Sequence, residues 1–345
     1  MKKTAVILFN LGGPDNLKAV RPFLFNLFND PAIIALPNPF RWVLAQIISR
    51  KRVKEATKIY QSLGGKSPLL EQTQAQSAAL EKELNTEKSN SYKIFTVMRY
   101  WHPRAETVFK EVCAYEPDEV VLLPLYPQYS TTTSASSFKE WQALSRGKFP
   151  TRVICCYPES EGFVATIAKE IDKALQNKNS KEKTRILFTA HGLPQKVIDA
   201  GDPYQQQINK TVAAIKKNMT QMQGVESVTC YQSRVGPLEW IKPYTDDEIK
   251  KAGKEGVSLI VVPIAFVSEH SETLVELDIE YKELAESWGV PSYQRIKTVQ
   301  DDPGFIQGLK KAVQSPGMLC DGCDQYNKCC FKNTLAQSKF FSTLT

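Results

Sequence analysis

Short apolar runs recur along this chain and alternate with polar segments that are long enough to form helices. The runs are apolar on both faces and are bounded by turn residues, as strands buried in a parallel sheet are. Seven runs are the expected strands: Ala5–Phe9, Ile94–Met98, Val120–Tyr126, Val153–Cys156, Ile186–Thr189, Ser227–Tyr231 and Leu259–Phe266. The expected helices between them include Thr73–Leu84, Gly162–Leu175 and Tyr204–Met219. This alternation predicts an α/β fold built on parallel sheets.

The two halves of the chain echo one another in two places. Residues 7–12, Ile-Leu-Phe-Asn-Leu-Gly, resemble residues 186–192, Ile-Leu-Phe-Thr-Ala-His-Gly. Residues 121–125, Val-Leu-Leu-Pro-Leu, resemble residues 260–264, Ile-Val-Val-Pro-Ile. A pair of similar doubly wound, Rossmann-like lobes would produce both echoes. Ligands of such folds bind beyond the carboxyl ends of the strands.

The chain length also favours two domains, because 345 residues exceed what one hydrophobic core usually serves. We expect an N-terminal lobe at residues 1–160 and a C-terminal lobe at residues 161–310. A cysteine-rich tail is expected at residues 311–345.

Composition and charge exclude several classes of protein. With 42% hydrophobic and 23% charged residues the chain is globular rather than disordered. No run of about 18 apolar residues exists, so no transmembrane helix is expected. The net charge of +7 comes from scattered basic residues, so nucleic-acid binding is not expected. Gly64-Gly65-Lys66-Ser67 and Gly12-Gly13-Pro14-Asp15 both lack the glycine spacing of nucleotide-binding loops.

One segment, residues 31–49, crowds apolar side chains around Pro37 and Pro39 and leads into basic residues 50–52. One interpretation is a core helix that follows a loop. The other is an exposed apolar lip that grips an apolar ligand or touches a membrane. Both interpretations are compatible with the sequence.

Two of the three histidines follow expected strands. His191 ends the run that begins at Ile186 and precedes Gly192, and His270 comes shortly after the run ending at Phe266. A histidine at the carboxyl end of a strand faces the ligand crevice of such a fold. The alternative for His191 is a structural histidine bonded to the backbone.

An acidic row follows His270. Glu272, Glu276 and Glu280 are spaced four apart, so they share one face of the expected helix. This row is either a solvated acidic stripe or a set of inward carboxylates that binds a divalent cation or passes protons. Histidine nitrogen together with carboxylate oxygen is a plausible ligand set for ferrous iron.

Seven separated motifs occur in an order that identifies a resemblance. They are Leu8–Pro14, Tyr60–Pro68, Met98–Pro103, Leu123–Ser130, Thr189–Pro194, Tyr231–Pro237 and Glu269–Glu280. On these motifs the chain resembles the ferrochelatase family over roughly residues 4–310. The resemblance implies a chelatase-type fold of two similar lobes and an enzyme that inserts Fe²⁺ into protoporphyrin IX with release of two protons.

The resemblance also implies roles for individual residues. His191 and Glu272 match the family's iron-contacting, catalytic pair, and Glu276 matches the next acid on the path of metal or protons. The residues that match porphyrin contacts are Leu11, Arg52, Tyr60, Ser67, Arg99, Tyr100 and Trp240. Residues 31–49 match the lip of the pocket. A neutral histidine can accept a pyrrole proton while a carboxylate compensates the arriving metal charge.

Three other functions compete with this one. Coproporphyrin is an alternative substrate, since it differs in having four propionates rather than two. A related chelatase acting on another tetrapyrrole or on cobalt is disfavoured by the extended matches at Tyr231–Pro237 and Glu269–Glu280. A non-catalytic regulator that binds haem or a cluster should have lost His191 or Glu272, and both are present.

The tail holds four of the eight cysteines, Cys320, Cys323, Cys329 and Cys330. Thiols so close together in a reducing compartment usually bind metal. The resemblance favours a [2Fe–2S] cluster, with zinc or no metal as alternatives. Thr131 stands where animal members of the family have a first-lobe ligand, so the tail supplies all four ligands, or one of Cys155, Cys156 and Cys230 completes the set.

The expected location is the cytoplasm, with possible peripheral contact to the inner face of the membrane through residues 31–49. Porphyrin and ferrous iron are the expected partners. The sequence is compatible with a monomer or a homodimer.

Overall fold

The computed structural model describes residues 1–87, 90–178, 183–221 and 224–315, together with the backbone of residues 319–320. The chain divides into two compact units, residues 158–308 and the remainder, so the boundary follows Tyr157 and the second boundary falls within helix α11, Pro303–Gln314.

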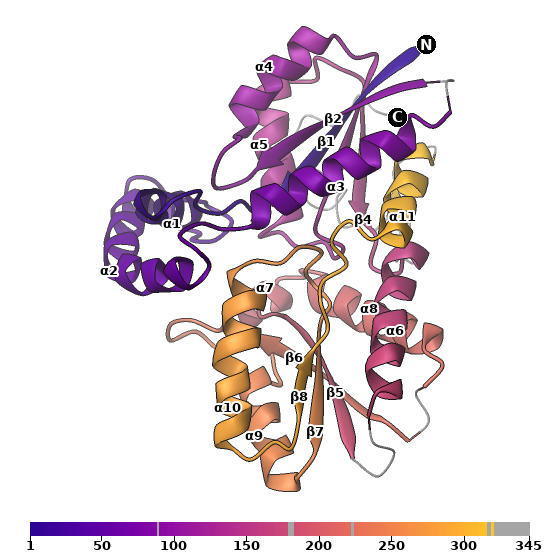
Figure 1. Cartoon of the computed structure of the whole chain (residues 1–345). Helices are drawn as coiled ribbons and strands as arrows, with labels where there is room; N and C mark the ends of the chain where they lie inside the picture. The colour runs from indigo at the N-terminus through magenta and orange to yellow at the C-terminus, as the bar shows by residue number, and fades with distance from the viewer. Residues whose placement is uncertain (88–89, 179–182, 222–223, 316–318, 321–345) are drawn as a thin grey trace. The chain divides into compact units, whose positions relative to one another are not determined.

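The first unit is built on a parallel sheet with strand order β2-β1-β3-β4-β9. Figure 1 labels its strands β1, β2 and β4. Its strands are β1 Lys2–Asn10, β2 Asn90–Met98, β3 Glu119–Pro124, β4 Thr151–Cys156 and β9 Leu319–Cys320. Its helices are the 3₁₀ turn η1 Leu17–Ala19, then α1 Val20–Phe28, α2 Phe40–Ser62, α3 Leu69–Leu84, α4 Ala105–Tyr115 and α5 Ser134–Ser145. Residues 5–8 of β1 are fully buried, as a strand covered on both faces must be.

The aromatic core of this unit lies under α4 and α5. Phe9 packs edge-on against Phe138 and Trp141 of α5, with ring centroids 5.8 and 6.1 Å apart. Phe109 of α4 also packs edge-on against Trp141, with ring centroids 5.6 Å apart. These contacts hold the carboxyl end of β1, and therefore the loop that follows it, in place.

The second unit is built on a four-stranded parallel sheet with strand order β6-β5-β7-β8. Its strands are β5 Thr184–His191, β6 Glu226–Gln232, β7 Ser258–Pro263 and β8 Tyr293–Arg295. Its helices are α6 Glu161–Gln176, α7 Gln195–Asp199, α8 Tyr204–Asn218, α9 Thr245–Glu255, the π-helix η2 Glu272–Glu280 and α10 Tyr281–Ser287.

The two sheets repeat one arrangement. Strand β1 lies between β2 and β3, and β5 lies between β6 and β7, all in parallel. The register also repeats, because Phe9 pairs with Pro124 in one sheet and Thr189 pairs with Pro263 in the other. The echoed segments therefore occupy equivalent places, and the prediction of two similar doubly wound sheets is confirmed.

All seven expected strands are present, with differences at their ends. Strands β3 and β7 stop at Pro124 and Pro263, where the expectation ran to Tyr126 and Phe266. Proline has no N–H to donate to a continuing ladder, which accounts for the earlier ends. Strands β8 and β9 were not expected, because three and two residues are too few to make an apolar run.

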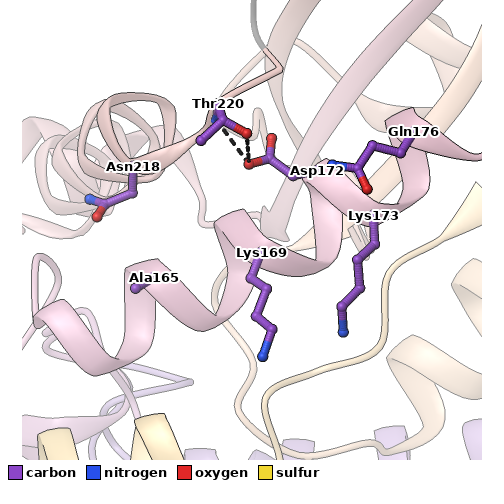
Figure 2. A pocket seen from close by; sticks show the side chains of 7 residues that line it. All are labelled: Ala165, Lys169, Asp172, Lys173, Gln176, Asn218 and Thr220. Carbon is purple, nitrogen blue, oxygen red and sulfur yellow. Dashed lines mark hydrogen bonds between the residues drawn. The ribbon is translucent and has the colours of Figure 1, made fainter.

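A surface pocket of about 350 Å³ lies along α6 of the second unit (Figure 2). Asp172 at this pocket accepts hydrogen bonds from the backbone N and the hydroxyl of Thr220, at 2.8 and 2.7 Å. Lys169 and Lys173 extend from the same helix. No residue singled out in the sequence lines this pocket, and Asp172 serves there to hold the chain that leaves α8.

Candidate active site

The candidate site lies at the carboxyl edge of the second sheet. His191 is the last residue of β5, and Gln232 is the last residue of the neighbouring strand β6. The two residues are partners in the parallel register. Because parallel strands end at one edge, residues that are 41 positions apart in the sequence become neighbours.

His191 is joined to the acidic segment by a short contact. Its Nδ1 lies 2.7 Å from Oε2 of Glu272. The side chains are 38% and 24% exposed, so the pair is partly shielded from water but open on one side. With Glu272 accepting at Nδ1, a neutral His191 presents its Nε2 lone pair outward.

Glu276 is held by hydrogen-bond donors from the end of β6, from the residue after that strand and from the start of α10. Its Oε2 accepts from Gln232 Nε2 at 3.0 Å and from the Ser233 hydroxyl at 2.5 Å. Its Oε1 accepts from the Ser233 backbone N at 2.8 Å and from the Tyr281 hydroxyl at 3.2 Å. The Ser233 hydroxyl also lies 3.2 Å from Oε2 of Glu272, so one serine links both acids.

The charges of the three groups are set by burial and by one another. Burial works against the carboxylate of Glu272, but His191 outweighs it and holds the pKa of Glu272 at about 2. Burial likewise opposes the imidazolium, yet Glu272 raises the pKa of His191 above its ordinary value. Burial and the neighbouring charge of Glu272 raise the pKa of Glu276. The site thus places an ionised acid, a titratable base and a readily protonated acid in sequence.

The acidic segment is a π-helix, whereas an α-helical row of three acids was expected. Residues 272–280 form the π-helix η2, and only Glu272 and Glu276 turn toward His191 and Ser233. Glu280 is exposed. Glu280 therefore fits the interpretation of a solvated acidic side chain, whereas Glu272 and Glu276 fit that of inward carboxylates. Such wide turns are rare and occur frequently at functional sites.

Two aromatic residues brace His191. The indole of Trp240 stands edge-on to the imidazole, with ring centroids 6.3 Å apart. Its Nε1 donates to the Val235 carbonyl at 3.1 Å. The Tyr204 hydroxyl donates to the His191 carbonyl at 3.1 Å. Gly192 permits this packing, since a Cβ there would lie 3.2 Å from Trp240 and 3.1 Å from the Gln232 carbonyl.

His270 lies within this region but has a different environment. It is 7% exposed, and its ring lies 4.5 Å from that of Phe266. Burial lowers the pKa of His270, so the ring is neutral. Its backbone N donates to the Thr273 hydroxyl at 2.9 Å, and that hydroxyl lies 3.1 Å from the His270 carbonyl, to which it donates.

Comparison with known proteins settles the family. The ferrochelatase family model matches residues 3–316. A ferrochelatase of Rickettsia bellii is 51% identical over 308 residues, covering 89% of this chain and 85% of that protein. A ferrochelatase of Caulobacter vibrioides is 49% identical over 328 residues, covering 93% and 94%. The chain belongs to the ferrochelatase family.

Family membership makes the chain a porphyrin metal-insertion lyase, as the resemblance implied. Among solved structures, SirB from Bacillus subtilis with Fe³⁺ matches with a TM-score of 0.52 at 13% identity, covering 91% of this chain and 95% of that chain. This structural likeness supports the fold alone.

The first unit of this ferrochelatase-family chain brings several predicted porphyrin contacts together. Tyr60 and Tyr100 lie in one apolar cluster, against which Leu11 packs. Arg52 stands over the Phe28 ring, 5.8 Å from its centroid. Ser67 is not in that cluster; it is buried, and its backbone N donates to the Pro14 carbonyl at 2.8 Å. Their contact with a porphyrin stays a prediction.

Arg99 and Tyr100 are engaged in a buried network that sequence reasoning missed. Asp30 Oδ2 accepts from Arg99 Nη2, from the Tyr100 hydroxyl and from the Ser136 hydroxyl, at 2.8, 2.8 and 2.5 Å. Asp30 is 4% exposed, and Arg99 also pairs with Glu140 at 3.1 Å. Asp30 immediately precedes the apolar segment 31–49. The network therefore anchors the residue from which that segment starts.

The apolar segment 31–49 is not a core helix. Phe40, Trp42 and Ile47 are 68%, 49% and 44% exposed. Its loop is closed by Arg41, whose side chain donates to the carbonyls of Asn29 and Leu36 at 2.9 and 2.6 Å. Across the described residues no helix is long and apolar enough to span a membrane.

The structure describes some of the cysteines and not others. Cys323, Cys329 and Cys330 lie outside the described residues, and β9 pairs the backbone of Cys320 with that of Cys156. Cys230 is fully buried, and burial raises the pKa of its thiol to about 12. Within residues that the structure describes, no group of three or more histidine, cysteine or acidic side chains is arranged to hold a metal ion.

Proposed function

We propose that the metal this chain inserts is Fe²⁺ and that its porphyrin is protoporphyrin IX, giving protohaem and two protons. The observation that supports the proposal most is the 2.7 Å contact between His191 Nδ1 and Glu272 Oε2. It orients one histidine nitrogen away from the acid, where a pyrrole N–H can reach it. It also sets a nitrogen and a carboxylate side by side, which suits Fe²⁺ as the incoming substrate.

The chemistry follows from the charges. Neutral His191 accepts a pyrrole proton at Nε2 and becomes an imidazolium. The carboxylate of Glu272, ionised at neutral pH, stabilises that imidazolium across the Nδ1 contact. Stabilising a charge that appears during the reaction lowers the barrier rather than merely tightening binding.

Glu276 provides the next position for a proton. Its raised pKa makes it easier to protonate than an ordinary carboxyl, and the Ser233 hydroxyl connects it to Glu272. A proton that leaves His191 can therefore pass along Glu272, Ser233 and Glu276. The imidazole then carries the pyrrole proton on Nε2, and the starting tautomer returns once Nε2 loses that proton to solvent and Nδ1 regains one through Glu272.

An anaerobic assay of the purified chain with protoporphyrin IX and Fe²⁺ tests the proposal, with haem formation followed by absorbance. We expect turnover by the native chain and its collapse in His191→Ala and Glu272→Ala. Turnover with coproporphyrin but none with protoporphyrin IX would contradict the substrate assignment. Turnover that survives both substitutions would contradict the mechanism.

Two further parts of the proposal concern the tail and the lip. We propose a [2Fe–2S] cluster on the tail cysteines Cys320, Cys323, Cys329 and Cys330, supported by their spacing. Equimolar iron and acid-labile sulfide in the purified chain would support it, whereas stoichiometric zinc or no metal would refute it. We propose a cytoplasmic chain whose residues 31–49 rest on the inner face of the membrane, supported by their exposed apolar side chains.

A further inference from the structure

Arg295 on strand β8 faces two carboxylates of the acidic segment, and its side chain is only 6% exposed. Its Nη1 donates to both oxygens of Glu269, at 2.8 and 2.9 Å. Its Nε and Nη2 donate in parallel to Oδ1 and Oδ2 of Asp278, at 2.6 and 2.5 Å. Paired bonds of this kind fix orientation as well as charge.

The two carboxylates bracket the proposed catalytic acids. Glu269 lies three residues before Glu272, and Asp278 lies two residues after Glu276 within η2. Arg295 therefore binds both the residues just before the π-helix and the last turn of that helix. Rotation or sliding of the segment between those ties would break bonds to a buried guanidinium.

Strand β8 adds a third tie. The Tyr293 hydroxyl donates to the Leu277 carbonyl at 2.7 Å, so the strand also holds the backbone of η2. Arg295 itself is anchored, because it pairs with Val261 of β7 and the next residue, Ile296, donates its backbone N to the Val261 carbonyl at 2.8 Å. The guanidinium thus projects from a fixed strand rather than from a loop.

The π-helix has particular need of such support. Five acids fall within residues 269–280, and the wide π turn makes poorer internal contacts than an α turn. Glu269 is 5% exposed, so its charge depends on a buried partner. Burial opposes the charge of Arg295, but Asp278 and Glu269 outweigh that effect and raise its pKa. The guanidinium therefore stays charged beside the two carboxylates.

We propose that Arg295 is a positioning residue for metal insertion, holding η2 so that Glu272 reaches His191 and Glu276 reaches Ser233. The inference rests on the proposed roles of Glu272 and Glu276. It assigns Arg295 no contact with porphyrin or iron.

The chain offers a matched control in Arg185. Its side chain is also 6% exposed, and its Nη2 pairs with Glu226 and Glu255 at 2.7 and 2.6 Å. Arg185 lies near the start of β5, whose far end is His191, about 20 Å away along the strand. Each arginine is a buried guanidinium paired with two acids, although the partners of Arg185 are 67% and 41% exposed. Of the two arginines, Arg295 is the one that contacts η2.

The test compares Arg295→Lys, Asp278→Asn and Arg185→Lys in the full chain by anaerobic steady-state kinetics with Fe²⁺ and protoporphyrin IX, alongside urea unfolding. Lysine keeps the charge but cannot make the parallel bonds. We expect kcat/KM for Fe²⁺ to fall about 10–100-fold in Arg295→Lys and Asp278→Asn, with KM for the porphyrin within about twofold of the native value. Arg185→Lys should keep kcat/KM for Fe²⁺ within about twofold, even if it is as destabilised.

Glu272→Gln, measured in the same series, separates the positioning role of Arg295 from the proposed catalytic role of Glu272. If Glu272→Gln collapses while Arg295→Lys and Asp278→Asn keep native kcat/KM, the positioning role is wrong and the proposed function stands. Equal losses in Arg185→Lys and Arg295→Lys, in proportion to their unfolded fractions, would also overturn it. If Glu272→Gln retains activity, the proposed mechanism itself fails. Asp278 is 35% exposed, so Asp278→Asn keeps the test open if Arg295→Lys does not fold.

Discussion

His191 Nδ1 lies 2.7 Å from Glu272 Oε2, although 81 residues separate the two in the chain. Each residue sets the charge of the other, raising one pKa and lowering the other. The contact uses one nitrogen of the imidazole and so defines which nitrogen serves the substrate. This relationship gives the site both a base and the charge that stabilises its conjugate acid.

Replacing His191 by Ala or Glu272 by Gln should lower kcat by about 10²–10⁴-fold, since a positioned general base contributes that much. The matched control is Glu280→Gln, because Glu280 belongs to the same acidic row but is exposed at the end of η2. Anaerobic haem formation under saturating substrates measures kcat. A comparable loss in Glu280→Gln would mean that the whole row, rather than the contact with His191, carries the effect.

The rate should depend on pH through His191. Glu272 raises the pKa of His191 above its ordinary value of 6.5, and the base must be neutral to accept a proton. Activity should therefore rise with pH through an apparent pKa above 6.5. In Glu272→Gln the attracting charge is gone and burial favours the neutral ring, so the residual activity should show this limb at lower pH. A limb that stays in place would show that another group titrates.

The same pair makes a signed contribution to stability. The raised pKa of His191 gives stability that is present below pH 6.5 and is lost as pH rises through the folded-state pKa. The pKa of Glu272, lowered to about 2, gives stability that is present above its ordinary 4.5 and is lost as pH falls toward 2. Urea unfolding at several pH values should therefore show that His191→Gln loses more stability at pH 6 than at pH 9. An equal loss at both values would contradict the shift.

Ser233→Ala should weaken metal insertion through the two acids that its hydroxyl reaches. The hydroxyl lies 2.5 Å from Glu276 and 3.2 Å from Glu272, and a hydrogen bond to a charged group contributes about 1.5–3 kcal/mol. We expect kcat/KM for Fe²⁺ to fall about tenfold. Ser287→Ala is the control, since that hydroxyl only bonds a carbonyl of its own helix. Native kinetics in Ser233→Ala would remove the serine from the proton path.

Asp30→Asn should destabilise the first unit by about 3 kcal/mol, because it leaves Arg99 without its most buried partner. The carboxylate side chain is 2% exposed and accepts from three side chains. Lys2→Met, which breaks the more exposed pair with Glu119, should change stability by less than about 0.5 kcal/mol. Urea unfolding measures both. Equal effects would show that the Asp30 network adds nothing beyond a surface pair.

Membrane contact through the lip should depend on its exposed apolar residues. Replacing Trp42 and Ile47 together by Ser should strongly reduce sedimentation with liposomes that contain anionic lipid. Trp288→Ser is the control, since Trp288 is 40% exposed and belongs to the second unit rather than to residues 31–49. Unchanged binding by the double variant would refute the contact.

The site could be predicted where residues follow strands. His191 stands out because it ends an apolar run, and Glu272 because it starts an acidic row just beyond another run. Their pairing is what the resemblance to the ferrochelatase family implies. Ser233 and Gln232 were missed as partners of Glu276. They stand in the motif Tyr231–Pro237, which supported the resemblance, and their position directly after a strand was the available signal.

Local patterns in the amino-acid sequence predict the strands, their grouping into two repeats and the sheet edge at which the site forms. These features can be predicted because short apolar runs and the turn residues that bound them are local properties of the sequence. The π-helix of the acidic segment, the exposed position of Glu280 and the buried networks of Arg295 and Asp30 are visible only once the chain is folded. Those features depend on hydrogen bonds between groups tens of residues apart, whose geometry no local pattern encodes.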